Sequence, residues 1–257
     1  MPLLETLGSG SARGFGLNSQ SIKIYQQALP NTISNLAGWY QADTWNGSNW
    51  PDSSGNGRTA TDTWGAGNIV KSTSYSGDMG ARKVFTTLHA NSNGGVRFSG
   101  DFDLTPNSYT LFTVARRYGG TTGGDSAQRG RIFDGSGQNW LSGFWNGNAG
   151  VAYHEGEING IGIDRHGNNW VISTDQYNLY KSNGVNRTGE NGVGGPGTIS
   201  GNTLFSLHYG NYTGPSGTER STWVCSEVIF YTRQLNSTEI QNVEGYLANK
   251  YGIEITQ

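Results

Sequence analysis

The chain is poor in cysteine, proline and charged residues, and the lack of cysteine excludes a fold held together by disulfide bonds. It has 257 residues, of which one is cysteine, six are proline and 14% are charged. A single cysteine cannot form an intrachain disulfide, which excludes the small secreted scaffolds that depend on such bonds. Cys225 lies in the apolar run 223–230, so we expect a buried and inert thiol.

Long basic runs and long apolar runs are also missing. The net charge is −2, and the nearest approach to a basic run is the pair Arg116-Arg117, so we predict no binding to nucleic acid. No stretch approaches the roughly 18 apolar residues that a membrane helix needs. Residues 1–7 lack the basic start and long apolar core of a signal peptide. We therefore expect a soluble protein without membrane insertion, which would leave a cell by lysis, on an assembled particle or by an unconventional exporter.

Glycine and aromatic residues are abundant. The chain has 41 Gly, 8 Trp, 13 Tyr and 9 Phe. Each aromatic side chain buries on the order of 150–250 Å², which supplies material for a core. Glycine alone adopts positive φ without steric cost and is typical of tight turns. This composition predicts a folded all-β protein.

Short apolar runs separated by turn residues predict one large domain of many strands. Residues 1–27, with the small-residue segment 8–16, are interpreted as a flexible N-terminal arm or linker, and residues 28–257 as the domain. Strands are expected at 36–40, 95–98, 109–115, 131–134, 170–174, 203–208 and 223–231. Primed turns are expected at Asn46-Gly47, Asn146-Gly147, Asn159-Gly160 and Asn183-Gly184.

One helix is expected near the end of the chain. Asn236 and Glu239 have the spacing of a capping box, and Gly252 supplies a stop. Between them, apolar residues recur at helical spacing, namely Ile240, Val243, Leu247 and Tyr251. The pattern predicts a short C-terminal helix that covers an edge or end of the strands.

Several of these segments together resemble a known family. The matching segments are 36–43, 50–57, 95–98, 109–112, 223–231, 233–235, 237–240, 243–247 and 250–252. They resemble concanavalin A-like, laminin G-like jelly-roll domains over about residues 33–253. The resemblance implies an all-β, two-sheet antiparallel jelly-roll sandwich. It says little about function, because this fold includes lectins, glycoside hydrolases, adhesion modules and structural shells. Segment 8–16 also resembles the leading segments of structural proteins of tailed bacteriophages and large DNA viruses.

The catalytic motif of glucan-cleaving members of this superfamily is absent. The resemblance implies acidic residues in the pattern Glu-x-Asp-x-x-Glu, whose alternation places two carboxylates on one face of a strand. The nearest approach is Glu155 and Glu157, and their glycine neighbours indicate a turn. We predict that the protein is not an enzyme, with a cryptic glycoside hydrolase as the third of three hypotheses.

No cofactor is expected, although one loop allows two interpretations. Histidines 89, 154, 166 and 208 lack metal-ligand spacing. The loop 52–57 contains Asp52, and Asp43 lies nearby, so calcium is one interpretation. The other is a turn in which Asp52 bonds its own backbone, which we favour because the loop holds a single carboxylate.

Loop aromatics beside amides are the most suggestive feature for binding. Sugar recognition combines rings that stack on C–H faces with amides that pair with hydroxyls. Three loops offer this mixture, and the candidate glycan-binding residues are Trp45, Asn49, Trp50, Trp140, Trp145, Asn146 and Tyr212. The alternative is that these tryptophans cover the ends of the sandwich as core.

The leading hypothesis is a non-enzymatic structural, decoration or attachment protein on the surface of a virion. Its expected partners are other virion proteins, bound through the N-terminal arm within an oligomeric assembly, and cell-surface glycans. The alternative is a free lectin-like carbohydrate-binding module outside the cell.

Overall fold

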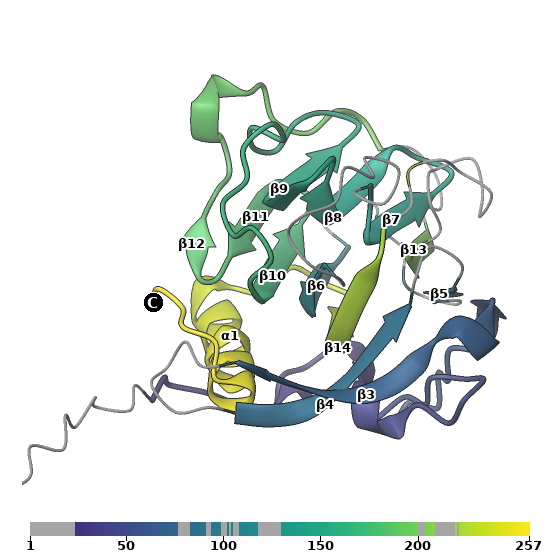
Figure 1. Cartoon of the computed structure of the whole chain (residues 1–257). Coiled ribbons are helices and arrows are strands. Elements are labelled where there is room, and N and C mark those ends of the chain that lie inside the picture. Colours follow the sequence, from purple (N-terminus) through teal and green to yellow (C-terminus); the bar gives the residue numbers. More distant parts are fainter. Residues whose placement is uncertain are drawn as a thin grey trace, which may run out of the picture.

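The computed structural model describes residues 24–76, 83–90, 94–98, 102, 104, 108–117, 130–199, 204–208, 219 and 221–257. These residues form two antiparallel sheets that pack face to face, with one α-helix beside the larger sheet (Figure 1). The predicted all-β, two-sheet sandwich with a short C-terminal helix is confirmed. Residues 1–23 of the predicted arm lie outside the described residues.

The larger sheet has eight strands. Its order is β12 (Val185–Asn186), β11 (Leu179–Ser182), β10 (Val171–Gln176), β6 (Thr110–Arg116), β14 (Trp223–Tyr231), β4 (Lys83–Ala90) and β3 (Val70–Ser76), and β1 (Leu36–Gln41) pairs with β14. One edge of β14 is shared, because β4 pairs with its start and β1 with its end.

The smaller sheet has six strands. Its order is β2 (Asp62–Trp64), β5 (Gly95–Arg97), β13 (Leu204–Leu207), β7 (Phe133–Ser136), β8 (Trp140–Trp145) and β9 (Asn148–His154). Short 3-10 helices occur in the connections, namely η1 (Pro30–Thr32), η2 (Ala42–Thr44), η3 (Ala66–Asn68) and η5 (Glu190–Gly192).

The space between the sheets is filled mainly by aromatic rings. The Phe98 ring lies 4.8 Å from Tyr40, 6.0 Å from Trp50 and 5.0 Å from Phe205, measured between centroids. Aromatic pairs at such separations add to the free energy gained by burying their area. The aromatic richness of the sequence is therefore used in the core.

Strand β14 is buried on both faces, which explains its nearly continuous apolar run. Val228 and Phe230 belong to the core between the sheets. Ile229 and Tyr231 point the other way and belong to a second core beneath the helix. A strand covered on both sides has no need of polar alternation.

The C-terminal helix α1 (Ser237–Tyr251) has the predicted ends. Asn236 and Glu239 form a capping box, and Gly252 takes the left-handed conformation at φ 67°. Its apolar side chains pack on the outer face of the larger sheet. Among the helices of the described ranges, none is long and apolar enough to cross a membrane.

The chain packs against α1 earlier than the predicted boundary at residue 28. The Tyr25 backbone N–H donates to Asn249 Oδ1 at 3.0 Å, and the Tyr25 hydroxyl donates to the Ile255 carbonyl at 2.8 Å. The Ala28 N–H donates to the Asn242 carbonyl at 3.2 Å. Residues 24–27 therefore lie on the domain, because they cover one side of the helix.

Two of the four predicted primed turns are present. Asn146-Gly147 joins β8 to β9 and Asn183-Gly184 joins β11 to β12, with positive φ at both positions of each pair. Asn46 instead accepts hydrogen bonds from the backbone of Ser48 and Asn49. Asn159 is buried, and its amide bonds the backbone of β9 at Ala152 and Gly150. At Asn46 and Asn159, the asparagine side chain forms hydrogen bonds with nearby backbone groups, and no primed turn is formed.

Candidate functional site

Three of the predicted glycan-binding tryptophans are in the core. The exposed fractions of Trp45, Trp50 and Trp140 are 3%, 0% and 0%. Trp50 Nε1 donates to the Gln41 carbonyl at 2.7 Å, and the Trp140 ring stacks on His154 with centroids 5.4 Å apart. No ring face of these three can meet a sugar, so the prediction was wrong for them. Their large apolar area is worth more between the sheets than in a loop.

The remaining candidates are distributed as follows. Asn49 is half-buried in a tight turn, where its carbonyl accepts from the Asn46 N–H at 3.3 Å. Tyr212 lies outside the described residues. Trp145 is half-buried and Asn146 is exposed, and the two are adjacent at the β8–β9 turn. Of the six candidates that the structure describes, only this pair lies together at an accessible surface.

Asp52 uses its carboxylate to shape its own loop. Oδ1 accepts from the backbone N–H groups of Trp39 at 2.9 Å and Ser54 at 2.8 Å. Oδ2 accepts from the Ser54 hydroxyl at 2.7 Å and the Arg58 N–H at 3.1 Å. This is the predicted turn, while Asp43 is exposed. Within the described ranges, no group of three or more His, Cys, Asp or Glu residues could hold a metal ion.

Two arginines hold the β8–β9 turn in place. The Arg131 guanidinium lies 5.2 Å from the Trp145 ring centroid, where a cation is attracted to the ring face. Arg131 is itself fixed by Glu219 Oε2 at 2.7 Å and Asn139 Oδ1 at 2.6 Å. Arg117 donates to the carbonyls of Gly147 and Asn148 at 2.8 and 2.7 Å. The turn is therefore rigid before any ligand arrives.

A second loop lies directly beside this turn. Asn148 Nδ2 donates to the Ile161 carbonyl at 2.9 Å, and the Ala149 N–H donates to Asp164 Oδ1 at 3.0 Å. Ile163 in this loop is 44% exposed although it is a large apolar residue. We call the two segments together, residues 145–148 and 161–164, the rim.

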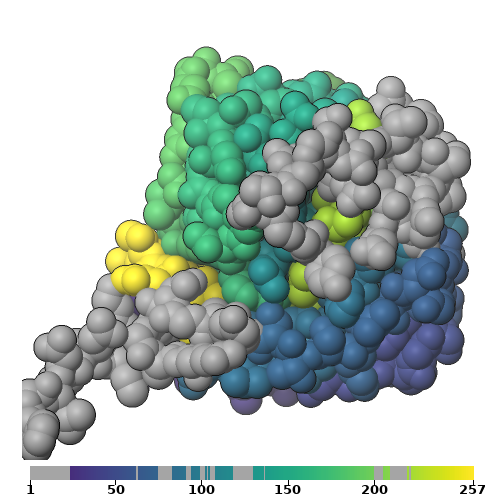
Figure 2. Space-filling view, in the orientation of Figure 1, coloured from purple at the N-terminus to yellow at the C-terminus, as the bar shows by residue number. Residues whose placement is uncertain are grey.

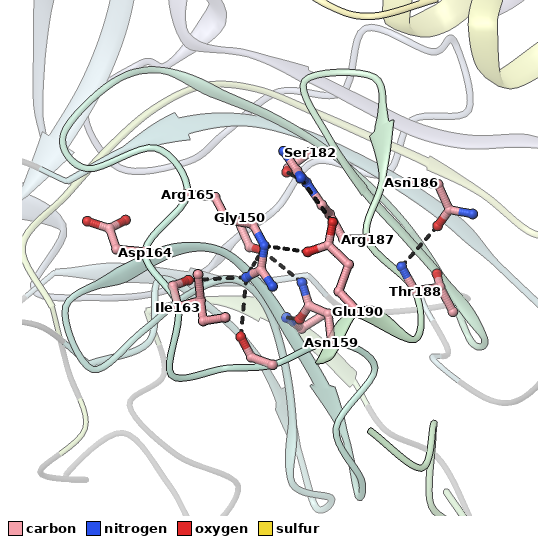
Figure 3. Close-up of polar contacts among 12 residues, drawn as sticks. Gly150, Asn159, Ile163, Asp164, Arg165, Ser182, Asn186, Arg187, Thr188 and Glu190 are labelled. Atoms are coloured by element: carbon pink, nitrogen blue, oxygen red, sulfur yellow. Dashed lines mark hydrogen bonds and ion pairs between the residues drawn. The ribbon is translucent and has the colours of Figure 1, made fainter. Parts of the chain in front are cut away.

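Arg165 holds the second loop from below. Its Nη1 donates to the carbonyls of Gly150, Gly160 and Ile163 at 3.1, 3.2 and 3.1 Å, and its Nε donates to Glu190 Oε2 at 2.7 Å (Figure 3). The side chain is only 5% exposed. A planar guanidinium with several donors suits this task, because it can bind carbonyls from several turns at once.

Glu190 and Arg187 complete the support. Arg187 Nη1 donates to Glu190 Oε1 at 3.0 Å, and Arg187 Nε donates to Ser182 Oγ at 3.1 Å (Figure 3). Burial alone would raise the pKa of Glu190, but hydrogen bonds from Arg187 and Arg165 outweigh it and hold that pKa below its usual value. The carboxylate thus stays charged between its two arginines.

His166 belongs to the same cluster as an uncharged group. Its Nε2 lies 2.8 Å from Ser182 Oγ. Burial, and then the charge of Arg187, lower its pKa to about 4. Sequence reasoning did not find this cluster, because the two loops carry charges about 25 positions apart. The only sequence signal was a group of charges in otherwise neutral, glycine-rich loops.

The two candidate catalytic carboxylates lie in the predicted turn after β9. Glu155 has a positive φ of 50°, and its Oε1 accepts from the Asn139 N–H at 2.6 Å. Glu157 follows in a bridge with Tyr153. The nearby His154 contacts Asp175 at 3.2 Å, and both side chains are fully buried, so they cannot touch a substrate in this structure.

Comparison with known proteins gives structural neighbours only. No family model matches the chain, and no curated protein matches it. A mutant Trypanosoma rangeli sialidase with trans-sialidase activity aligns with a TM-score of 0.51 and 13% identity, over 92% of this chain and 38% of that one. The T. rangeli sialidase itself gives 0.50 and 15%, over 90% and 36%. Domain 4 of an extracellular arabinanase from Geobacillus stearothermophilus, in complex with arabinotriose, gives 0.48 and 15%, over 81% and 97%.

The chain spans little more than a third of the length of the sialidases it matches. Identity of 13–15% supports a shared fold and nothing finer. The chain is therefore a β-sandwich of the jelly-roll-like kind found within these sialidases.

Proposed function

We propose that this chain is a non-enzymatic attachment module on the surface of a virus particle, and that it binds glycans at the rim. The observation that carries the proposal is the β8–β9 turn. It presents a half-buried tryptophan, whose ring lies against Arg131, next to an exposed amide, on a backbone that Arg117 holds. This is the combination of ring and amide that sugars require.

The rigidity of the rim supports binding by preorganisation. Ordering loops on association costs free energy, and that cost is small when the loops are already held. Arg131 covers one face of the Trp145 ring, so a sugar would stack on the part that the arginine leaves open. Asn146 would pair with hydroxyls, and Ile163 would contact the apolar side of the sugar ring.

The positions of the Glu155 and Glu157 carboxylates support the proposal that the chain is not an enzyme. One oxygen of Glu155 is engaged by the backbone of Asn139, and both residues lie in a turn rather than on one strand face. The test is release of reducing sugar from a panel of oligosaccharides. Hydrolysis that disappears in Glu155→Gln or Glu157→Gln would contradict the proposal.

The particle location rests on the N-terminal segment. Residues 1–23 precede the packed domain and are rich in glycine and serine, as expected of a tether to another protein. A free lectin-like module fits the fold equally well and would use the same rim. Mass spectrometry of purified particles from the source organism separates the two, because only the attachment module would be found there in stoichiometric amounts.

Glycan binding is tested on an array with three proteins. The unmodified chain and Trp145→Tyr, which keeps an aromatic ring, should bind the same glycans. Trp145→Ala should lose at least tenfold in affinity, since stacking on the ring is removed while the arginines remain. Equal binding by all three proteins, or no glycan bound by the unmodified chain, would contradict the assignment of the rim.

A further inference from the structure

A cavity of about 270 Å³ lies between α1 and the edge strands of the larger sheet. Leu179, Leu235 and Ile240 supply its aliphatic lining, which we call the floor, and Lys181 and Ser237 also line it. Gln176, Asn186 and Gln241 contribute amides to its walls. Figure 1 shows α1 beside β10, β11 and β12, and in Figure 2 the green surface around residues 180–195 lies against the yellow C-terminal segment.

The amide of Gln176, which lines this cavity, has an oxygen that is available to a ligand. Gln176 is 5% exposed, and its Nε2 donates to Thr110 Oγ1 at 2.9 Å and to the Leu235 carbonyl at 3.0 Å. Within the described residues, no donor bonds its Oε1. The Oε1 atom can therefore accept a hydrogen bond from an N–H group of an occupant, because its amide is already held in place through Nε2.

The size and lining suit an extended peptide better than a larger ligand. The volume is below the roughly 300–1,000 Å³ of drug-sized ligand sites. An aliphatic floor accepts one or two leucine-sized side chains, and the amide walls accept the backbone N–H and C=O groups that flank them. A peptide with adjacent aliphatic residues meets both demands.

The chain carries such a segment close by. Residues 3–7 read Leu-Leu-Glu-Thr-Leu, the densest aliphatic run of the 23 residues before the packed domain. The described chain begins beside α1, the helix that lines the cavity, because the Tyr25 N–H donates to Asn249 near the end of this helix. From Asn249 to Gln241 at the cavity, the helix rises about 12 Å.

The connecting residues are long enough for the same chain to reach its own cavity. Residues 8–23 are rich in glycine and serine, and a flexible linker of that length has a root-mean-square span of about 20–24 Å. This span exceeds the distance of about 12 Å along the helix, so the linker can reach the cavity, and a short flexible linker keeps the effective concentration in the millimolar range.

We propose that residues 3–7 dock in the cavity between α1 and β10–β12 of the same chain, with Leu3 and Leu4 on its aliphatic floor. This concerns the isolated protein before it meets any assembly. It does not depend on glycan binding at the rim, so either idea can fail without the other.

The test is disulfide trapping in the full-length chain. Leu4→Cys is combined with Gln241→Cys, an exposed position that lines the cavity. The native Cys225 does not interfere, because it is fully buried and burial raises the pKa of its thiol. The matched control combines Leu4→Cys with Gly67→Cys, where an added Cβ meets nothing within 4 Å. Position 67 adjoins β3, at the end of the larger sheet where β14 begins, whereas the cavity lies where β14 ends.

Under mild oxidation, the 4–241 pair should form an intramolecular disulfide at least tenfold faster than the 4–67 pair. Adding Leu3→Asp and Leu7→Asp should remove that advantage, since charged side chains cannot occupy the floor. Equal rates for the two pairs would overturn the proposal. A rate that the aspartates leave unchanged would also overturn it, as would trapping mainly as covalent dimers, which would place the segment on another copy.

Discussion

Trp50 and Trp145 both lie beside asparagine residues in the sequence, yet one is part of the core and the other lies at the surface. Trp50 is fully buried and packs against Tyr40 with ring centroids 5.9 Å apart, whereas Trp145 remains half-buried under Arg131. Composition identifies both as candidates for sugar binding. Only the pairing of strands decides which ring faces inwards, because a single step in register reverses the face of every residue.

The first prediction compares these two tryptophans. Trp50→Ala should lower the free energy of unfolding by about 3–5 kcal/mol through lost burial and a residual cavity. For a domain of this size that corresponds to a fall in Tm of roughly 6–20 °C. Trp145→Ala should change Tm far less, because Trp145 is only partly buried and Arg131 keeps its other partners. Thermal unfolding of both variants checks this, and equal losses would assign Trp145 to packing.

The second prediction concerns pH and His166. Its folded-state pKa of about 4 is below the ordinary 6.5, so the unfolded chain binds the extra proton first as pH falls. Protonation of His166 therefore has no effect on the free energy of unfolding above pH 6.5. It lowers that free energy progressively between pH 6.5 and 4, and the loss is complete below pH 4. Allowing for solvent screening, the loss is about 2 kcal/mol.

Urea unfolding from pH 7 to pH 4 measures this loss. His166→Gln keeps a polar group near Ser182 without the titration, so it should flatten the curve in that window. Burial also lowers the pKa of His89, so its protonation lowers the free energy of unfolding as well. His89→Gln therefore shows how much of the pH dependence belongs to that second histidine. A curve that His166→Gln leaves unchanged would contradict the assignment of an uncharged histidine to this cluster.

At the scale of elements, local signals predicted some parts of the fold well. The capping box of α1, the stop at Gly252 and the turn at Asn146-Gly147 depend on neighbours within a few residues, and all are present. Strand β14 was recognised because burial on both faces leaves a continuous apolar run. In each case, the residues that determine the structure are close together in the sequence.

Other elements carry no clear local signal and were not predicted. Strands β3 and β4 pair with each other from Val70–His89 to Ser76–Lys83, but they are rich in Ser, Thr and Lys and carry no apolar periodicity. The support of the rim by Arg165 likewise needs Glu190 from another loop. Hydrogen bonds between residues far apart in the sequence leave no local pattern to read.

The third prediction concerns the contact between α1 and residues 24–29. Replacing a helix glycine with alanine normally stabilises by about 1 kcal/mol. At Gly245, however, a Cβ would lie 1.9 Å from the Gln26 carbonyl oxygen, so the backbone of the segment must move. Gly245→Ala should therefore lower the free energy of unfolding by about 1–3 kcal/mol. It should also speed amide hydrogen exchange at residues 24–29.

Gln241→Ala is the control for this effect, because residue 241 is an exposed position on the same helix. It should change the free energy of unfolding by less than about 0.5 kcal/mol. If Gly245→Ala instead stabilises the protein, the segment does not lie against the helix as the structure has it.

On the scale of the whole molecule, two buried carboxylates join α1 to the larger sheet. Glu227 on β14 accepts from Lys250 Nζ and Trp39 Nε1, both at 2.5 Å. Glu244 on the helix accepts from Lys181 Nζ at 2.6 Å and Thr174 Oγ1 at 2.7 Å. The helix is thereby fixed in position as well as buried, which makes its outer side a stable surface for residues 24–29.

The proposed glycan-binding rim and the N-terminal segment belong to different parts of the fold. The rim belongs to the turn between β8 and β9 of the smaller sheet, whereas the N-terminal segment approaches along α1, on the outer face of the larger sheet. The first described residues, 24–29, thus lie on α1 and not on the rim. That layout suits a protein that attaches by one side and binds by the other.

The last prediction uses this separation and compares two truncations. Removing residues 1–23 leaves the contacts of Tyr25 and Ala28 with α1 in place, so glycan binding should stay close to that of the full chain. The free energy of unfolding should fall only by the contribution of docked residues 3–7, which is smaller than the loss in the longer truncation. Removing residues 1–29 also removes the Tyr25 hydrogen bonds to Asn249 and Ile255 and uncovers the helix. That loss should cost roughly 3 kcal/mol. Both truncated proteins should fail to join the particle, but the longer truncation should unfold more readily in urea than the shorter one. If the shorter truncation unfolds as readily as the longer one, residues 1–23 are part of the folded domain and not a tether, and the attachment role assigned to them would be wrong.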